Sequence, residues 1–200
     1  MRWTMIGALL GVVFMLAACQ SGTTDPDAIP SATSAPQSAS EVSSIIPLDQ
    51  VKKSQAGSVT QTVATTEIAV TYNRPVARGR NLFGGIVPYG EIWNPGADQA
   101  TAVAFSRNVQ INSRPLPAGK YSIWAIPGAD QWTVIFSKAA DVFHTPYPGE
   151  QRDALRITVV PETGTHMETL AFYFPVVEGK DAVLRLHWGE VMVPMRLQVD

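Results

Sequence analysis

From about residue 56 to the C-terminus, the chain consists of short runs in which apolar and polar residues alternate. A period of two places successive side chains on opposite faces of a strand, so each run predicts a β-strand with one buried face. Glycine, proline, asparagine and aspartate separate the runs and indicate tight turns. No run in this region has a convincing helical period. The pattern therefore favours an all-β fold.

The predicted strands can be placed along the chain by their alternating apolar residues. Residues 121–126 are apolar on both faces, which is typical of a central strand. Turns are expected at Asn112-Ser113, at 117–119 and at 128–130. About nine or ten short strands joined by such turns predict an antiparallel β-sandwich, with which a jelly-roll arrangement is compatible. The other predicted strands lie at 67–73, 103–105, 109–111, 132–136, 155–159, 170–174, 184–188 and 191–199.

The first residues carry the features of an export signal. Arg2 supplies a positive charge, and an uncharged apolar run from Met5 to Leu16 follows it. About a dozen apolar residues are too few to span a bilayer as a mature helix. The sequence Leu16-Ala17-Ala18-Cys19 resembles a bacterial lipobox, in which a peptidase cuts before the cysteine and lipid is attached to its thiol. We therefore expect residues 1–18 to be a lipoprotein signal peptide.

Cys19 is the single cysteine of the chain, so an internal disulfide is impossible. Lipidation accounts for this odd thiol, and the alternative is an ordinary secretory signal with a chance cysteine. Two acyl chains anchor a protein stably where one is marginal. The next residue is Gln20 rather than aspartate, which resembles an outer-membrane address in Gram-negative bacteria. The expected location is the bacterial cell envelope, at the outer membrane if the host is Gram-negative.

A tether is expected between the cysteine and the domain. Residues 20–44 are mostly serine, threonine, alanine and proline, and cannot bury enough apolar surface to fold. As a flexible coil they would span about 25–30 Å. Residues 45–55 contain Ile45, Ile46 and Leu48, which either dock on the domain or begin its first strand. We assign residues 19–55 to the lipidated cysteine and tether, and residues 56–200 to the β-sandwich.

Between Tyr72 and Thr101, about 30 residues lack clear alternation, and connections of this length inside compact domains are often functional. This segment contains Arg74-Pro75, Gly79-Arg80, Phe83-Gly84-Gly85, Val87-Pro88-Tyr89-Gly90, Trp93 and Gly96-Ala97-Asp98. With the later Leu116–Ser122, Ile126-Pro127-Gly128 and Trp132, these motifs resemble an exported bacterial family, domain-of-unknown-function family 2911. The resemblance runs from about Ser58 to the C-terminus. It supports the fold and export predictions and implies no particular activity.

Two positions depart from that family's pattern. The family usually has Arg-Thr after the tryptophan, where this chain has Asn94-Pro95. It usually has asparagine after Gly-Ala, where this chain has Asp98. If those polar positions carry a shared chemistry, this chain has altered or lost it.

The same segment supplies the candidate ligand-binding residues. Aromatic faces beside charged hydrogen-bonding groups suit sugars and other polar ligands, so these side chains would line a pocket at one end of the sandwich. The alternative is an ordered loop in which an arginine bonds to carbonyls and a tryptophan fills the core. In either case we expect Arg80 to be buried and paired, because an unpaired buried guanidinium is costly. The candidates are Arg74, Arg80, Tyr89, Glu91, Trp93 and Asp98.

Several classes of function lack support in the sequence. It has no Gly-x-Ser-x-Gly motif, no glycine-rich phosphate loop and no histidine pair with zinc-ligand spacing, so we predict no metal and no cofactor. His144, His166 and His187 are far apart in sequence, and His187 is predicted on the outward face of its strand. A net charge of −2 argues against a nucleic-acid partner.

Three functional hypotheses remain. The first is a non-catalytic binding or accessory module whose partner is an envelope glycan, a small molecule or an envelope protein. The second is an envelope hydrolase in which Glu91 and Asp98 act as acid and base and Arg80 orients the substrate. Glycoside hydrolysis requires two carboxyl groups about 5–5.5 Å or about 6.5–9.5 Å apart. The third is a structural protein whose long loop docks on another protein.

Overall fold

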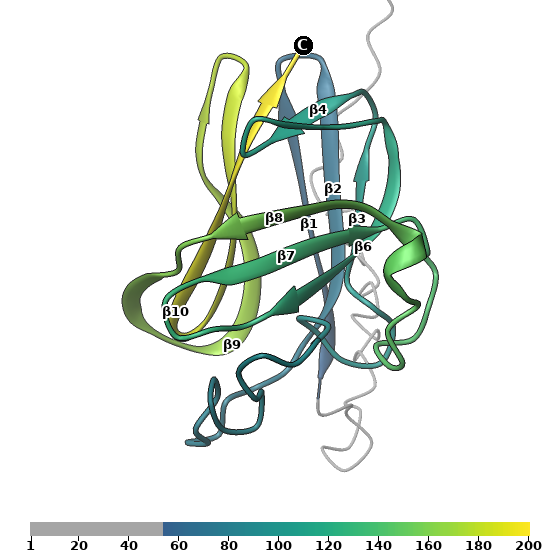
Figure 1. Ribbon diagram of the computed structural model, residues 1–200. Coiled ribbons are helices and arrows are strands. Elements are labelled where there is room, and N and C mark those ends of the chain that lie inside the picture. Colours follow the sequence, from purple (N-terminus) through teal and green to yellow (C-terminus); the bar gives the residue numbers. More distant parts are fainter. Residues whose placement is uncertain (1–53) are drawn as a thin grey trace, which may run out of the picture. The chain divides into compact units, whose positions relative to one another are not determined.

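The computed structural model describes residues 54–200, which form two antiparallel β-sheets packed as a sandwich (Figure 1). One sheet has six strands in the order β1-β2-β3-β6-β7-β8, and the other has four in the order β5-β4-β10-β9. A short 3-10 turn, η1, spans Glu150–Arg152. The strands are β1 (Gln55–Val63), β2 (Thr66–Arg74), β3 (Ala102–Phe105), β4 (Val109–Ile111), β5 (Arg114–Leu116), β6 (Gly119–Ile126), β7 (Trp132–Ser137), β8 (Asp153–Val159), β9 (Glu162–Glu178) and β10 (Asp181–Val199).

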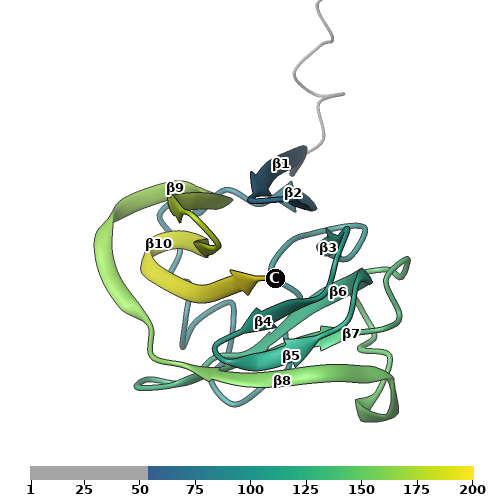
Figure 2. The same cartoon turned by 90° about the horizontal axis from the view of Figure 1, so that it is seen from above.

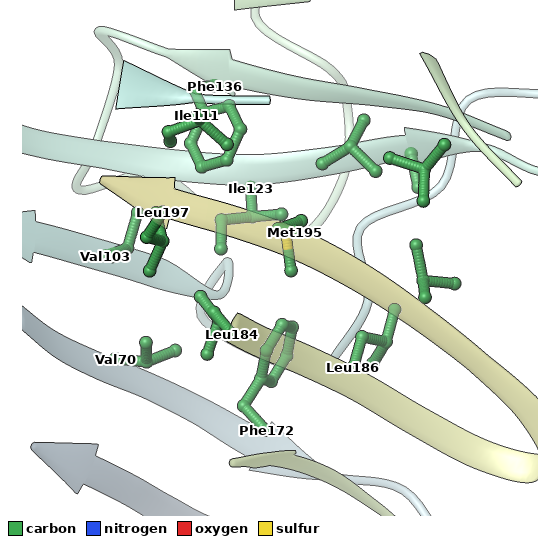
Figure 3. Close-up of a cluster of buried hydrophobic side chains, with 14 of the residues drawn as sticks. Val70, Val103, Ile111, Ile123, Phe136, Phe172, Leu184, Leu186, Met195 and Leu197 are labelled. Atoms are coloured by element: carbon green, nitrogen blue, oxygen red, sulfur yellow. The ribbon is translucent and has the colours of Figure 1, made fainter. Parts of the chain in front are cut away.

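The alternating residues of the sequence form the core between the two sheets. Figure 3 shows side chains of β2, β3, β6 and β7 facing those of β4, β9 and β10. On β2, for example, Ile68, Val70 and Tyr72 are buried while Glu67 and Thr71 are exposed. The predicted all-β sandwich is confirmed, and β6 is a central strand because it pairs with β3 on one side and β7 on the other.

The prediction of separate strands at 184–188 and 191–199 is wrong, because both belong to β10. The register with β9 shifts on either side of Gly189, which has a φ of +59°. A bulge moves the following residues to the opposite face of the strand. Leu186 and Trp188 are therefore buried before the bulge and Val193 after it, so one strand has the sequence pattern of two.

The prediction that His187 points outward is also wrong, since only 4% of its surface is exposed. Its Nε2–H donates to the carbonyl of Thr165 at 3.1 Å, and its Nδ1 lies 3.3 Å from the hydroxyl of Tyr173. Both partners belong to β9, which curves together with β10 in Figure 2. Residues of the curved hairpin thus bury a side chain that a flat strand would expose.

The outer face of β6 and β7 carries a second, smaller apolar cluster. Trp124 and Ile135 are buried there, and Val142 and Tyr147 pack against them. These two covering residues belong to a loop, here called the 138–149 loop, that connects β7 to η1. The cluster explains why β6 is apolar on both faces.

The predicted signal peptide, Cys19 and most of the predicted tether lie outside the described residues. β1 begins at Gln55, one residue before the expected start of the domain. Within residues 54–200, no helix has the length and apolar character needed to cross a membrane.

Candidate functional site

The predicted long connection is an irregular segment between β2 and β3, here called the 75–101 loop, at one end of the sandwich (Figure 1). Its first part pairs with β9, because the Leu170 N–H donates to the backbone carbonyl of Pro75 and the Ala77 N–H donates to the backbone carbonyl of Glu168. Its later part pairs with β6 through two 2.8 Å bonds between Trp93 and Ala125. Since β9 and β6 belong to different sheets, the loop ties the two sheets together.

Aromatic side chains hold the inner side of this loop on the core. Trp93 stacks on Trp188 of β10, with ring centres 6.0 Å apart and planes 14° from parallel. Phe83 meets Trp132 edge to face at 4.8 Å. Such pairs contribute about 0.5–1.5 kcal/mol beyond the apolar area that they bury. Trp93 therefore fills the end of the core, as the ordered-loop alternative predicts.

Asn94 is one of the positions that depart from the family pattern, and its side chain forms hydrogen bonds that hold the loop in place. Its side chain is buried, and its Nδ2 donates to the Ile123 carbonyl at 2.8 Å. Its Oδ1 accepts the Thr101 N–H at 3.2 Å. The amide thereby joins the loop to β6 and to the residue that precedes β3.

A groove of about 280 Å³ lies between the outer side of the loop and the bulged part of β10. Its apolar lining comes from the loop and from β10, and its polar lining includes a cation, an anion, an amide, a phenol and an imidazole. A hollow that combines apolar side chains with several polar groups can hold a small ligand. The lining residues are Arg80, Asn81, Leu82, Phe83, Tyr89, His166, Trp188, Gly189, Glu190 and Val191.

Arg80 is fixed by the loop itself. Its Nε donates to the Ala77 carbonyl at 2.9 Å, and its Nη2 donates to the Val76 carbonyl at 2.6 Å. Its pairing with carbonyls is as predicted, but its predicted burial is wrong, because the residue is exposed. The bonds come from residues three and four positions earlier, so the guanidinium is held without being covered. No carboxylate pairs with it in the described part of the chain, and its Nη1 has no protein partner there.

Two glycines allow the groove to form. Gly84 has a φ of +78°, and a Cβ on it would lie 2.7 Å from the ring of Tyr89. Gly189 in the β10 bulge has a φ of +59°, and a Cβ there would lie 2.8 Å from Leu82. A side chain at either position would displace a lining residue. The glycines therefore permit the loop to approach β10 and the Tyr89 ring to lie over the loop backbone.

His166 links the groove to a carboxylate beside it. Its Nε2 lies 2.9 Å from Glu168, whose other oxygen accepts the Arg78 N–H at 2.6 Å. The hydrogen bond from His166, followed by that from the Arg78 backbone, lowers the pKa of Glu168. The two bonds hold Glu168 to the turn at Arg78 and orient the imidazole at the rim of the groove.

The six predicted site residues do not form one wall, because only Arg80 and Tyr89 line the groove. Arg74 donates from Nε to the Leu170 carbonyl at 3.2 Å, which is a structural contact. Glu91 is exposed and outside the groove lining. Asp98 lies elsewhere, with its carbonyl accepting the His144 Nδ1–H at 2.9 Å. The two carboxylates of the hydrolase hypothesis therefore do not meet in this groove.

Sequence reasoning missed three polar residues of the groove, namely Asn81, His166 and Glu190. Asn81 lies within the candidate segment, between the Gly79-Arg80 and Phe83-Gly84-Gly85 motifs, and belongs to neither. His166 and Glu190 come from β9 and β10, far along the chain. Their proximity to the loop depends on the pairing of Val76 with Thr169, for which the sequence has no recognisable signal.

Two other features of the described domain supply no charged ligand set. A hollow of about 370 Å³ on the face of β1 and β2 has no charged side chain among the described residues that line it. Across residues 54–200, no three His, Cys, Asp or Glu side chains are grouped so that they could hold a metal ion.

Comparison with known families agrees with the motifs of the loop. The family described as Protein of unknown function (DUF2911) matches residues 54–197, which is well over half of the chain. The chain belongs to this family. The match covers both sheets and the whole 75–101 loop, so the groove lies inside the DUF2911 domain. No curated protein and no solved structure matches the chain.

Proposed function

We propose that this protein is a lipid-anchored envelope lipoprotein whose DUF2911 domain binds a small polar ligand, without catalysis, in the groove beside the 75–101 loop. The observation that supports this proposal is the groove and its lining. A tether and lipid on Cys19 would hold the domain at the bacterial envelope, where glycan fragments and small metabolites are available as ligands.

The lining of the groove supports a ligand with both an apolar face and polar groups. Tyr89 is 49% exposed, so its ring offers a face on which a sugar or another flat ligand can stack. Leu82 and Trp188 are buried beneath the groove and supply apolar contact. Asn81 and His166 add hydrogen-bonding groups at the rim.

Arg80 is the residue on which specificity would depend. Its two bonds to carbonyls immobilise the guanidinium before a ligand arrives, so less side-chain entropy is lost on binding. Nη1 remains able to donate to a carboxylate, phosphate or hydroxyl. Among the described residues no carboxylate pairs with this guanidinium, so an anionic ligand would not have to displace one.

A ligand screen on the full chain tests the binding role. The full-length protein, purified from membranes, is screened by thermal shift against envelope glycan fragments and small metabolites. A ligand at about 100 times its dissociation constant stabilises a protein by about 2.7 kcal/mol. We expect Arg80→Ala to abolish the shift and Arg152→Ala to retain it, because Arg152 is an exposed arginine on η1 outside the groove. An equal shift in Arg80→Ala would exclude the proposed site.

The anchor has its own test. Cells that express the wild-type chain or the Cys19→Ala variant are grown with a fatty-acid probe, and the protein is recovered from membrane and soluble fractions. We expect label and membrane retention to be lost in Cys19→Ala, because the thiol is the acceptor of the lipid. Labelling of the variant as strong as that of the wild type would rule out lipidation at this residue.

A further inference from the structure

We infer that the apex of the 75–101 loop, residues 86–92, docks on the surface of the phospholipid bilayer to which the protein is tethered. This inference rests on the proposed lipid anchor. Ile86, Tyr89 and Ile92 are 47%, 49% and 37% exposed. These three large apolar side chains fall within one short stretch of the loop, together with the exposed Pro88. Tyr89 also lines the groove, so Ile86 and Ile92 are the two side chains left for contact with lipid.

The exposure of these side chains is built into the loop. Ile86 is held by a 3.0 Å bond from its N–H to the Asn81 carbonyl, and the Gly90 N–H donates to Pro127 at 2.8 Å. The neighbouring Leu82 and Val87 point into the protein and are buried. The loop therefore buries some of its apolar side chains and leaves others in water. A fixed backbone that presents isoleucine outward is suited to the interface of a bilayer, where aliphatic side chains can leave water.

The topology places this apex at the end of the domain where the chain enters. β1 begins at Gln55, which pairs with Arg74, the last residue before the loop (Figure 1). The anchor and the loop therefore lead to the same end of the sandwich. The turn of the β9–β10 hairpin, with the exposed Val176 and Val177 beside it, lies at the other end (Figure 1).

With a tether of the predicted length, a weak contact with lipid would be sufficient to orient the domain. If the predicted tether between Cys19 and Gln55 is a flexible coil, its roughly 35 residues would span about 30–35 Å and would keep the domain near the membrane without fixing its orientation. Such a tether produces an effective concentration in the millimolar range. Contact by Ile86 and Ile92 can then orient the domain even if its affinity for lipid alone is low, and Tyr89 stays available to the groove.

Charge near the apex favours a neutral surface over a charged partner. Arg78 and Arg80 precede the apex and Glu91 lies within it, and all three are exposed. The apex is therefore neither strongly basic nor strongly acidic. Insertion of apolar side chains into the interface, rather than attraction to anionic lipid or to an acidic protein, is the interaction that this composition supports.

Site-specific fluorescence on the full lipidated chain tests the inference. An Ile86→Cys variant is labelled with an environment-sensitive dye and reconstituted into vesicles of phosphatidylethanolamine and phosphatidylcholine, with or without nitroxide-bearing lipid. Val177→Cys, labelled in the same way, is the control at the far end of the domain. We expect a blue shift and nitroxide quenching at position 86, and neither at position 177. Adding Ile92→Ser should weaken the quenching at position 86.

Flotation of the same vesicles separates the two proposals. Protein that floats with the vesicles while the dye at position 86 stays water-like or unquenched would overturn the docking and leave the anchor intact. A blue shift without quenching would mean that another protein or a second copy covers the apex, and would also overturn the docking. Protein that does not float would overturn the anchor, and the docking with it.

Discussion

Two irregular segments cover parts of the sandwich, and they use their polar side chains in different ways. Around the 138–149 loop, Tyr147 donates to Asp153, and Arg156 donates from Nε to the same carboxylate at 2.6 Å. Glu150 accepts a further bond from Arg156 at 3.0 Å. In the 75–101 loop, Arg80 bonds only to backbone carbonyls and lines a groove.

This difference distinguishes a stabilising loop from a candidate binding loop. In the 138–149 region, burial and then the hydrogen bond to Asp153 raise the pKa of Tyr147, while the bonds to Asp153 and Tyr147 raise that of Arg156. These side chains satisfy one another and have little capacity left for a ligand. In the 75–101 loop, aromatic rings and backbone bonds maintain the structure, so the polar groups of the groove remain available.

The largest effect on stability is expected from the aromatic side of the 75–101 loop. Trp93→Ala removes the ring that stacks on Trp188 and should lower the free energy of unfolding by about 3 kcal/mol. Tyr89→Ala, at an exposed ring of the same loop, should change it by less than about 1 kcal/mol. Urea unfolding followed by circular dichroism measures both. Equal losses of unfolding free energy in Trp93→Ala and Tyr89→Ala would mean that the loop has no separate structural and binding sides.

The polar network of the 138–149 region should have the next largest effect. Asp153→Ala removes the acceptor shared by Tyr147 and Arg156 and should lower the free energy of unfolding by about 2 kcal/mol. Glu150→Ala removes a carboxylate whose side chain is 77% exposed and should cost less than about 0.5 kcal/mol. The same urea experiment measures both variants. An Asp153→Ala protein as stable as the wild type would show that the network is dispensable.

The smallest effect is expected from the exposed pair beside the groove. The pKa of Glu168 is lowered in the folded state, so its contribution to stability is present above the ordinary glutamate pKa and is lost as the pH falls through the folded value. Melting temperatures measured from pH 3 to pH 7 should therefore drop less steeply at the acid end in Glu168→Gln. Glu190→Gln, which removes another exposed carboxylate of the groove, is the matched control. Identical slopes in all three proteins would contradict the role of Glu168.

The fold was predictable where burial alternates and less so where it does not. Ile68, Val70 and Tyr72 define β2 because one face is buried and the other exposed. In β1, only Val63 is buried, so the strand has no clear apolar period in the sequence. The bulge at Gly189 reverses the pattern within β10, which explains why one strand was predicted as two.

The candidate site was predictable only in part, for a related reason. Arg80 and Tyr89 belong to a glycine-rich connection that is unusually long for a sandwich, so they could be selected from the sequence. His166 and Glu190 lie on strands whose register brings them to the loop. Register follows from packing across the whole sheet, and no local motif encodes it. The partial burial of Trp93 and the burial of Asn94 likewise depend on contacts with Trp188 and Ile123, which are distant in sequence.

The most direct test of the account measures stability and binding on the same two variants. Arg80→Ala and Asp153→Ala are each titrated with the strongest ligand from the screen and unfolded in urea. The account predicts that Arg80→Ala unfolds like the wild type but loses ligand affinity, whereas Asp153→Ala is less stable and binds with wild-type affinity. Loss of stability in Arg80→Ala without loss of affinity would contradict the central claim that the groove beside the 75–101 loop is a binding site.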